Sequence, residues 1–328
     1  DQEGRDVAYA FEEYPLIHEK PGWSEHDAGR YWDVACRLMK QAVQEGNVSP
    51  ADIAGIAVSS ALPSMVLVDK NHNPVHRAYN LMDKRADQEI EWISENIGES
   101  RTFALSGYRL EDHPNLVNVL WEKRNRPDGY KRIWKVLTID GFIVLKLTGK
   151  ATAHYSAAAF YGVAYNLRDG HFDEKMLGEI GVDPSLMPDL FHCDEIVGEV
   201  TGEAAERAGL APGIPVAAGQ VDCNASWIGA GSIEVGDIQS NLGTVGNFGI
   251  VHRDMDFVFS DIGRKLMSFP YTTRDTLITV PTTTTGGQTL RYLRDAFGQA
   301  EQEAERLLGI SAYDLFNVEA DKDAVGSE

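Results

Sequence analysis

The sequence predicts an α/β fold organised in two domains. Short apolar runs of strand length alternate with stretches in which apolar residues recur every three to four positions, as in α/β proteins. The 328 residues, 43% of them hydrophobic, suffice for two domains that each bury a core. Helical patterns give way to hairpin patterns near Gly231, so we expect one domain at residues 1–231 and another at residues 232–328.

The first part of the chain is predicted to contain two strands around a helix. Residues 1–5 indicate a hairpin turn, and residues 7–11 a strand after it. Ser24 is expected to cap a helix with Asp27 in its first turn, where the helix dipole favours a negative charge. Its apolar face comprises Tyr31, Val34, Ala35, Leu38, Ala42 and Val43. The apolar run at residues 53–58 predicts the next strand.

The middle of the chain is predicted to be mostly helical. A strand at residues 65–68 is closed by turn residues at 71–74. Helical patterns then dominate residues 85–149, with Gly149 as the expected C-cap, and a short helix follows at residues 203–209.

Strands dominate the remaining sequence. Residues 214–218 predict a buried strand that enters a loop at Gly219. Residues 237–242 and 247–251 predict paired strands, and residues 276–280 predict another. An amphipathic helix follows, marked by Leu290, Leu293, Ala296 and Phe297.

Composition excludes several classes of partner. The net charge of −20, from 50 acidic and 30 basic residues, would repel nucleic acid and anionic membranes, so we expect neither as a partner. Cys36, Cys193 and Cys223 lie far apart without C-x-x-C spacing, which argues against a disulfide framework or a zinc site and favours the cytoplasm. No apolar run approaches the roughly 20 residues that a membrane helix needs.

Three segments carry residue types suited to phosphoryl transfer onto a hydroxyl group. The strand at residues 214–218 delivers Asp222 beyond its carboxyl end, where sites of α/β sheets lie and a carboxylate can accept a proton. The turn at Gly243 and Thr244, and the threonine-rich residues 282–287 before a helix, can hold phosphate oxygens. Taken singly, each segment has an ordinary alternative: a solvated or helix-capping carboxylate, a plain turn, or a connection.

Taken together, the segments resemble the FGGY family of carbohydrate kinases along nearly the whole chain. Residues 213–222, Gly-Ile-Pro-Val-Ala-Ala-Gly-Gln-Val-Asp, are similar to the family segment that ends in the catalytic aspartate. Further likenesses lie at residues 21–27, 83–86, 147–149, 195–200 and 204–210. The resemblance implies an actin-like (ribonuclease H-like) fold with two domains around a cleft, sugar bound mainly by the first and ATP mainly by the second.

The resemblance also implies roles for single residues. Asp222 is expected to contact the sugar and to act as the general base. Gly243 and Thr244 match the family's phosphate turn, and Gly287 with Arg291 falls where the family places nucleotide contacts. The expected cofactors are ATP and Mg²⁺.

Two departures from the family pattern bear on the sugar. Leu62 and Pro63 stand where xylulokinases tend to show Gln-Met-His and glycerol kinases Gln-Arg-Glu, so the expected sugar site lacks those side-chain hydrogen bonds. Cys223 stands where asparagine often follows the aspartate, and Asn224 is adjacent. All four residues are predicted sugar contacts.

His113 and Asp83 are further candidates for sugar binding. His113 lies near the position of a substrate-contacting aromatic residue in glycerol kinases, with an ordinary loop histidine as the alternative. Asp83 has as its alternative a pair with Arg85 on a surface turn.

Both ends of the chain lack expected elements of the family. The first phosphate loop, an Asp-x-Gly-Thr/Ser turn whose aspartate helps to organise magnesium, is expected before Asp1, and no metal ligand is predicted within the chain. The second domain is expected to be incomplete, so the 328 residues alone are not expected to turn over.

The function expected from the sequence is ATP-dependent phosphorylation of a small sugar, with a ketopentose such as xylulose as first choice. Gluconate, other ketoses and polyols remain alternatives. A non-catalytic actin-like protein that binds sugar or nucleotide is the alternative of another class, and a glycoside hydrolase would need two carboxylates across a glycosidic bond. The oligomeric state is left open, with a homodimer as one alternative.

Overall fold

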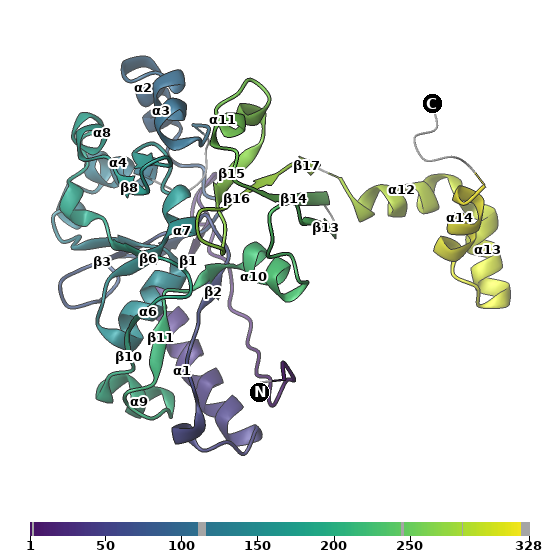
Figure 1. The fold of residues 1–328 in the computed structure, drawn as a ribbon, viewed down its shortest axis with the longest axis horizontal. Helices are drawn as coiled ribbons and strands as arrows, with labels where there is room; N and C mark the ends of the chain where they lie inside the picture. The colour runs from purple at the N-terminus through teal and green to yellow at the C-terminus, as the bar shows by residue number, and fades with distance from the viewer. Residues whose placement is uncertain (2, 111–115, 244–245, 284, 323–328) are drawn as a thin grey trace. The chain divides into compact units, whose positions relative to one another are not determined.

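The computed structural model describes residues 1, 3–110, 116–243, 246–283 and 285–322. Helices and strands are mixed throughout, so the predicted α/β class is confirmed (Figure 1). Two compact units are present: Asp1–Asp237 with Val251–Thr279, and Ile238–Ile250 with Val280–Glu328. The division into two domains at Gly231 stays a prediction.

The first unit holds most of the secondary structure. Its helices are α1 Ala28–Glu45, α2 Asp87–Asn96, α3 Glu99–Ser106, α4 Leu116–Asn125, α5 Pro127–Tyr130, α6 Ile139–Thr148, α7 Tyr155–Ala159, α8 Glu174–Ile180, α9 Gly202–Ala208, α10 Asp222–Gly229 and α11 Met255–Val258. Its strands are β1 Glu25–His26, β2 Ser59–Ser60, β3 Val66–Val68, β4 Ala78–Tyr79, β5 Lys135–Leu137, β6 Thr152–His154, β7 Tyr165–Asn166, β8 His171–Phe172, β9 Asp189–Phe191, β10 Ile196–Glu199, β11 Pro215–Ala217, β12 Gln220–Val221, β15 Met267–Pro270 and β16 Leu277–Val280. Single 3₁₀ turns lie at Pro50–Asp52, Pro184–Leu186 and Gly263–Lys265.

The second unit combines a hairpin with helices. Its elements are β13 Ile238–Leu242, β14 Gly246–His252, β17 Thr282–Thr283, α12 Gly287–Phe297, α13 Gln299–Leu308 and α14 Ala312–Ala320. β13 and β14 pair antiparallel, with Leu242 opposite Gly246, so the predicted hairpin is confirmed. β17 pairs with the start of β14.

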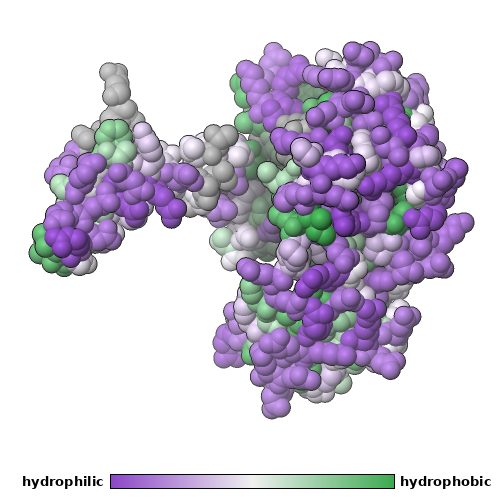
Figure 2. Space-filling model, turned by 180° about the vertical axis from the view of Figure 1, so that it is seen from behind, coloured by the Kyte–Doolittle hydropathy of each residue, from purple (hydrophilic) through white to green (hydrophobic). Residues whose placement is uncertain are grey.

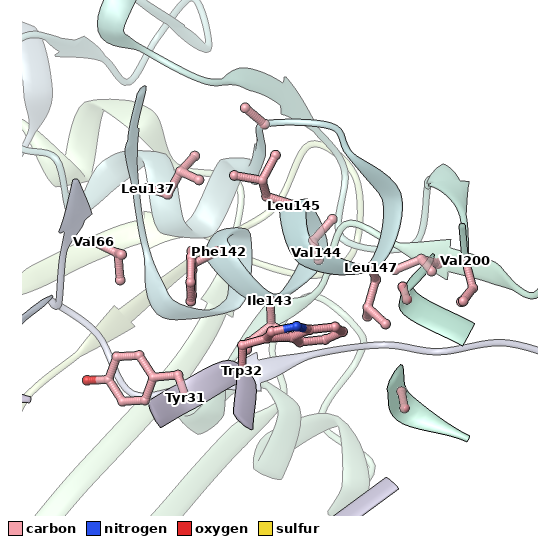
Figure 3. Packing of buried hydrophobic residues seen from close by; sticks show 14 of the residues in the cluster. Tyr31, Trp32, Val66, Leu137, Phe142, Ile143, Val144, Leu145, Leu147 and Val200 are labelled. Atoms are coloured by element: carbon pink, nitrogen blue, oxygen red, sulfur yellow. The ribbon is translucent and has the colours of Figure 1, made fainter. Parts of the chain in front are cut away.

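Helix α6 lies at the centre of the main hydrophobic core. Phe142, Val144 and Leu147 are fully buried and belong to one cluster with Tyr31 and Trp32 of α1 (Figure 3). Residues 142–145 place apolar side chains on every side of the helix, and such a segment is stable only inside a core, which explains why these residues are buried. A second core cluster forms around α4 and α8.

Several local predictions are confirmed and three are wrong. Gly149 and Gly209 end α6 and α9 in the left-handed conformation, as their positions predicted. Ser24 does not cap α1: Asp27 is the N-cap, and its carboxylate accepts from Gly29 N, because the helix begins three residues later than expected. Residues 7–11 form no strand, and β-structure in 53–58 is limited to a bridge at Ile56.

The surface is mainly polar. Figure 2 shows that hydrophilic residues dominate the face that it draws, as expected for a chain with 24% charged residues. Among the described residues, no helix has both the length and the apolar character that crossing a membrane requires.

Candidate active site

Asp222 is positioned by two parallel strands that end together. β12 runs parallel to β2, with Val221 opposite Ser60, so Asp222 and Ala61 leave the pair at the same edge. Gly219 permits this approach: its φ is +98°, and a Cβ there would lie 2.5 Å from Val58 O. The strand predicted at 214–218 therefore continues through a second short strand before it reaches the carboxylate.

Asp222 is the first residue of α10, and its carboxylate is accessible. The residue is exposed, and Oδ1 accepts a hydrogen bond from Cys223 N at 2.7 Å. Burial raises the pKa of the carboxyl above its ordinary value, because surrounding protein atoms remove part of its hydration, and the backbone hydrogen bond opposes this shift. A carboxylate that is accessible and has a raised pKa is suited to accept a proton.

The predicted neighbours of Asp222 are largely apolar. Leu62 is half-buried and Pro63 is buried, in the loop that follows β2. Ser64 Oγ donates to Ala61 O at 2.9 Å and so closes this loop on itself. Burial, together with the Asp222 charge, raises the pKa of the Cys223 thiol to about 12, so this group is a neutral thiol.

Asn224 is fully buried rather than exposed beside Asp222. Its exposed fraction is 0%, and its amide donates to Ser156 Oγ at 3.4 Å and to Gln220 Oε1 at 3.3 Å. These partners lie in α7 and β12. The Asn224 side chain therefore points into the protein and joins α10 to α7 and β12. A direct contact with a sugar would require this side chain to turn outward.

Asp83 is buried with its oxygens occupied. It accepts from Ser24 N at 2.8 Å, from Arg85 Nη2 at 2.6 Å and from Asn118 Nδ2 at 3.3 Å. Arg85 is itself buried, 3.8 Å above the centre of the Trp23 ring. The pair with Arg85 therefore exists, but the expected surface location is wrong, because aromatic rings cover the guanidinium group.

Two of the predicted nucleotide contacts lie together in the second unit. Gly287 N donates to Gly243 O at 2.7 Å, which joins the hairpin turn to the first residue of α12. A Cβ on Gly287 would lie 3.0 Å from Gly243 O, so the closeness depends on glycine. Arg291 is exposed one turn further along α12. Thr244 and His113 lie outside the described residues.

A buried polar cluster at the end of β2 was not predicted from the sequence. Ser60 Oγ donates to Asp140 Oδ1 at 2.6 Å, and His154 Nε2 lies 3.2 Å from Asp140 Oδ2. One signal was present in the sequence: Asp140 lies in the first turn of a helix whose residues 142–145 are all apolar. Its partners lie about 80 and 14 positions away, and no local pattern connects them.

Ligand groups for metals are not gathered in the described part of the chain. No group of three or more His, Cys, Asp or Glu side chains there could hold a metal ion. Cys36, Cys193 and Cys223 are free thiols.

Fold and site together define an α/β protein with an accessible carboxylate where parallel strands end. The profile of the FGGY family of carbohydrate kinases, N-terminal domain, matches residues 1–229. The chain belongs to this family.

Individual relatives agree with this membership. Xylulose kinase from Staphylococcus xylosus is 27% identical over 237 residues, which covers 72% of this chain and 48% of that protein. Autoinducer-2 kinase from Klebsiella pneumoniae is 27% identical and matches 100% of this chain and 61% of its own length. The chain thus spans about half to three fifths of these curated relatives.

A solved structure confirms the fold. Xylulose kinase from Rhodospirillum rubrum superposes with a TM-score of 0.82 at 22% identity, covering 95% of this chain and 61% of that one. The actin-like fold implied by the sequence resemblance is therefore confirmed.

Proposed function

We propose that this protein transfers the terminal phosphoryl group of ATP to a hydroxyl group of a small sugar, with Asp222 as the general base. The observation that carries the proposal is the position of Asp222. It is accessible, follows the parallel strands β12 and β2, and has a carboxyl whose pKa is raised. Membership of a family of carbohydrate kinases supports the same reaction.

Asp222 has a defined task in this reaction. Its free oxygen accepts the proton of the attacking hydroxyl, while the bond from Cys223 N holds the other oxygen in place. Leu62 and Pro63 lie in the loop after β2, which ends at the same edge as β12, and their low polarity would favour exclusion of water once a sugar is bound. General-base catalysis of this kind contributes about 10²–10⁴-fold to a rate.

The second unit offers a fitting place for the nucleotide phosphates. Gly243 and Gly287 bring a turn and a helix N-terminus together without side chains, which would let phosphate oxygens approach the backbone of both elements. Arg291 would add a positive charge on the same helix. ATP supplies the phosphoryl group and Mg²⁺ neutralises its charge when bound; the described residues provide no cluster for the metal, so its ligands are not assigned.

We propose a ketopentose such as xylulose as the substrate, with gluconate, another ketose or a polyol as alternatives. Support comes from the relatives named as xylulose kinases. Leu62 and Pro63 offer no side-chain hydrogen bonds, so sugar hydroxyls at that edge would rely on backbone groups. Three free thiols also suit the reducing cytoplasm that we propose as its location.

ADP release with a panel of sugars tests the proposal. The full-length protein, supplied with ATP and Mg²⁺, should release ADP only when a suitable sugar is present, and mass spectrometry should find the sugar phosphate. Absence of sugar-dependent ADP across ketoses, gluconate and polyols would count against a kinase and favour a binding protein.

A further inference from the structure

Ser60, Asp140 and His154 form a buried cluster at the end of β2, which is one of the two parallel strands that lead to the candidate site. Asp140 and His154 have exposed fractions of 0%, and that of Ser60 is 7%. Ser60 Oγ donates to Asp140 Oδ1 at 2.6 Å and receives Asp140 N at 3.3 Å. His154 Nε2 lies 3.2 Å from Asp140 Oδ2, in an orientation short of a full hydrogen bond.

Stability of the fold does not by itself explain this cluster. A carboxylate inside a protein loses its hydration, and buried ionic groups can often be replaced by apolar side chains without loss of stability. Residues 142–145 of α6 are apolar and buried, so an apolar residue would suit the site of Asp140. A buried polar network in such surroundings calls for a reason of its own.

The first connection of Asp140 leads to the loop beside Asp222. Ser60 is the last residue of β2, and it lies opposite Val221, directly before Asp222. The same residue precedes the loop with Leu62 and Pro63. The bond to Asp140 therefore fixes the point from which this loop departs.

The second connection of Asp140 leads through His154 and α7 to helix α10. His154 Nδ1 accepts from Ala157 N at 3.1 Å and caps α7, so in the neutral ring the proton is on Nε2, which faces Asp140. Ser156, also in α7, accepts from Asn224 of α10. Asp140 is thus linked to both elements that flank Asp222.

We propose that Asp140 is a positioning residue which, through Ser60 and His154, holds the loop after β2 and the start of α10 in the geometry that sugar binding requires. This inference rests on the proposed function for the identity of the ligand. Its structural part, the anchoring of two strand ends, is independent of any reaction. Asp140 itself touches no substrate.

The chain contains a matched control for this cluster. His76 Nε2 lies 2.7 Å from Glu122 Oε1, and the Glu122 side chain is also fully buried. In this second histidine–carboxylate pair, Glu122 accepts hydrogen bonds from Tyr79 and Arg126, which lie outside β2 and β12. His76→Gln therefore disturbs an equivalent pair without releasing the strand ends.

Hydrogen exchange of the full-length protein without ligand tests the structural part. Asp140→Asn and Ser60→Ala should accelerate amide exchange in peptides covering β2 and β12 by about fivefold or more, since the anchored ends open more often. His76→Gln should leave these two segments at the wild-type rate. Ser60→Ala keeps the buried carboxylate, so it serves if Asp140→Asn folds poorly.

Steady-state kinetics on the same variants tests the link to sugar binding. Asp140→Asn and Ser60→Ala should raise the KM for the sugar about tenfold while kcat changes less than about threefold, as expected when ground-state positioning is lost. His154→Gln keeps a donor towards Asp140, so it should raise the KM for the sugar less than His154→Leu does.

The outcomes separate the two proposals. Unchanged exchange in β2 and β12 for both Asp140→Asn and Ser60→Ala would overturn the inference, as would an equal effect of His76→Gln. A wild-type protein that phosphorylates no sugar would overturn the proposed function, and the exchange data would still decide the anchoring.

Discussion

Two aspartates that were both predicted to contact the sugar have opposite surroundings. Asp83 is 1% exposed, and its oxygens are occupied by Ser24, Arg85 and Asn118. Asp222 is exposed and accepts one backbone hydrogen bond, from Cys223. A carboxylate whose acceptor sites are filled holds a fold together, whereas one with a free oxygen can receive a proton. Residue type alone therefore does not distinguish the two aspartates, whereas the occupancy of their hydrogen-bonding groups does.

The largest expected effect separates the two residues by activity. Asp222→Asn should lower kcat for sugar phosphorylation by about 10²–10⁴-fold, because the amide cannot accept the proton. The burial that raises the Asp222 pKa destabilises its ionised form, so the variant should not lose thermal stability at neutral pH.

Asp87→Asn is the matched control for this substitution. Asp87 is also exposed and also begins a helix, α2. It should leave kcat unchanged when assayed by coupled ADP release. Retained turnover in Asp222→Asn would contradict the assignment of the base.

The second effect concerns stability. Asp83→Asn should lower the free energy of unfolding by roughly 3–5 kcal/mol, since it leaves Arg85 buried with a weakened set of partners. Denaturant unfolding of the full-length protein measures it. Asp128→Asn breaks an exposed pair with Lys131 and should cost less than about 1 kcal/mol. If Asp83→Asn proved as mild as Asp128→Asn but impaired sugar binding, Asp83 would belong to the site after all.

The contrast between these aspartates also shows what the sequence can predict. Helix ends at Gly149 and Gly209, the hairpin of β13 and β14, and the strand before Gly219 follow from residues that are neighbours in sequence. The position of Asp222 followed from the same kind of local pattern.

Burial of polar groups was beyond such patterns. Asp83 is buried because Trp23 and Trp121, distant in sequence, cover its partner Arg85. The cluster at Asp140 joins residues from β2, α6 and the end of β6. These contacts exist only once the chain is folded, so periodicity and spacing do not show which residues meet. Asn224 was placed at the sugar by its neighbour in sequence, although its side chain points into the protein.

The third effect is a dependence on pH. The Asp222 pKa is raised chiefly by burial, so the base becomes protonated at a higher pH than an ordinary aspartate. The value of kcat/KM should be constant above this pKa and fall about tenfold for each pH unit below it.

The contribution of Asp222 to stability depends on pH in the opposite direction from its contribution to activity. A raised pKa favours the protonated carboxyl in the folded state, so its contribution is present at low pH and is lost as pH rises through the folded pKa. A pH–rate profile whose acid limb lies at or below the ordinary aspartate pKa would contradict a base with this environment.

The smallest effect lies in the second unit. In Gly287→Ala the added Cβ would lie 3.0 Å from Gly243 O, so the contact between the turn and α12 should widen by a few tenths of an ångström. The KM for ATP should rise several-fold, about 1 kcal/mol of binding, while the KM for the sugar stays constant. Gly202→Ala is the control, because Gly202 also begins a helix and a Cβ there meets nothing within 4 Å. Equal ATP affinity in both variants would remove Gly243 and Gly287 from the proposed nucleotide site and leave Asp222 unaffected, since the two sets of residues are tested by different substrates.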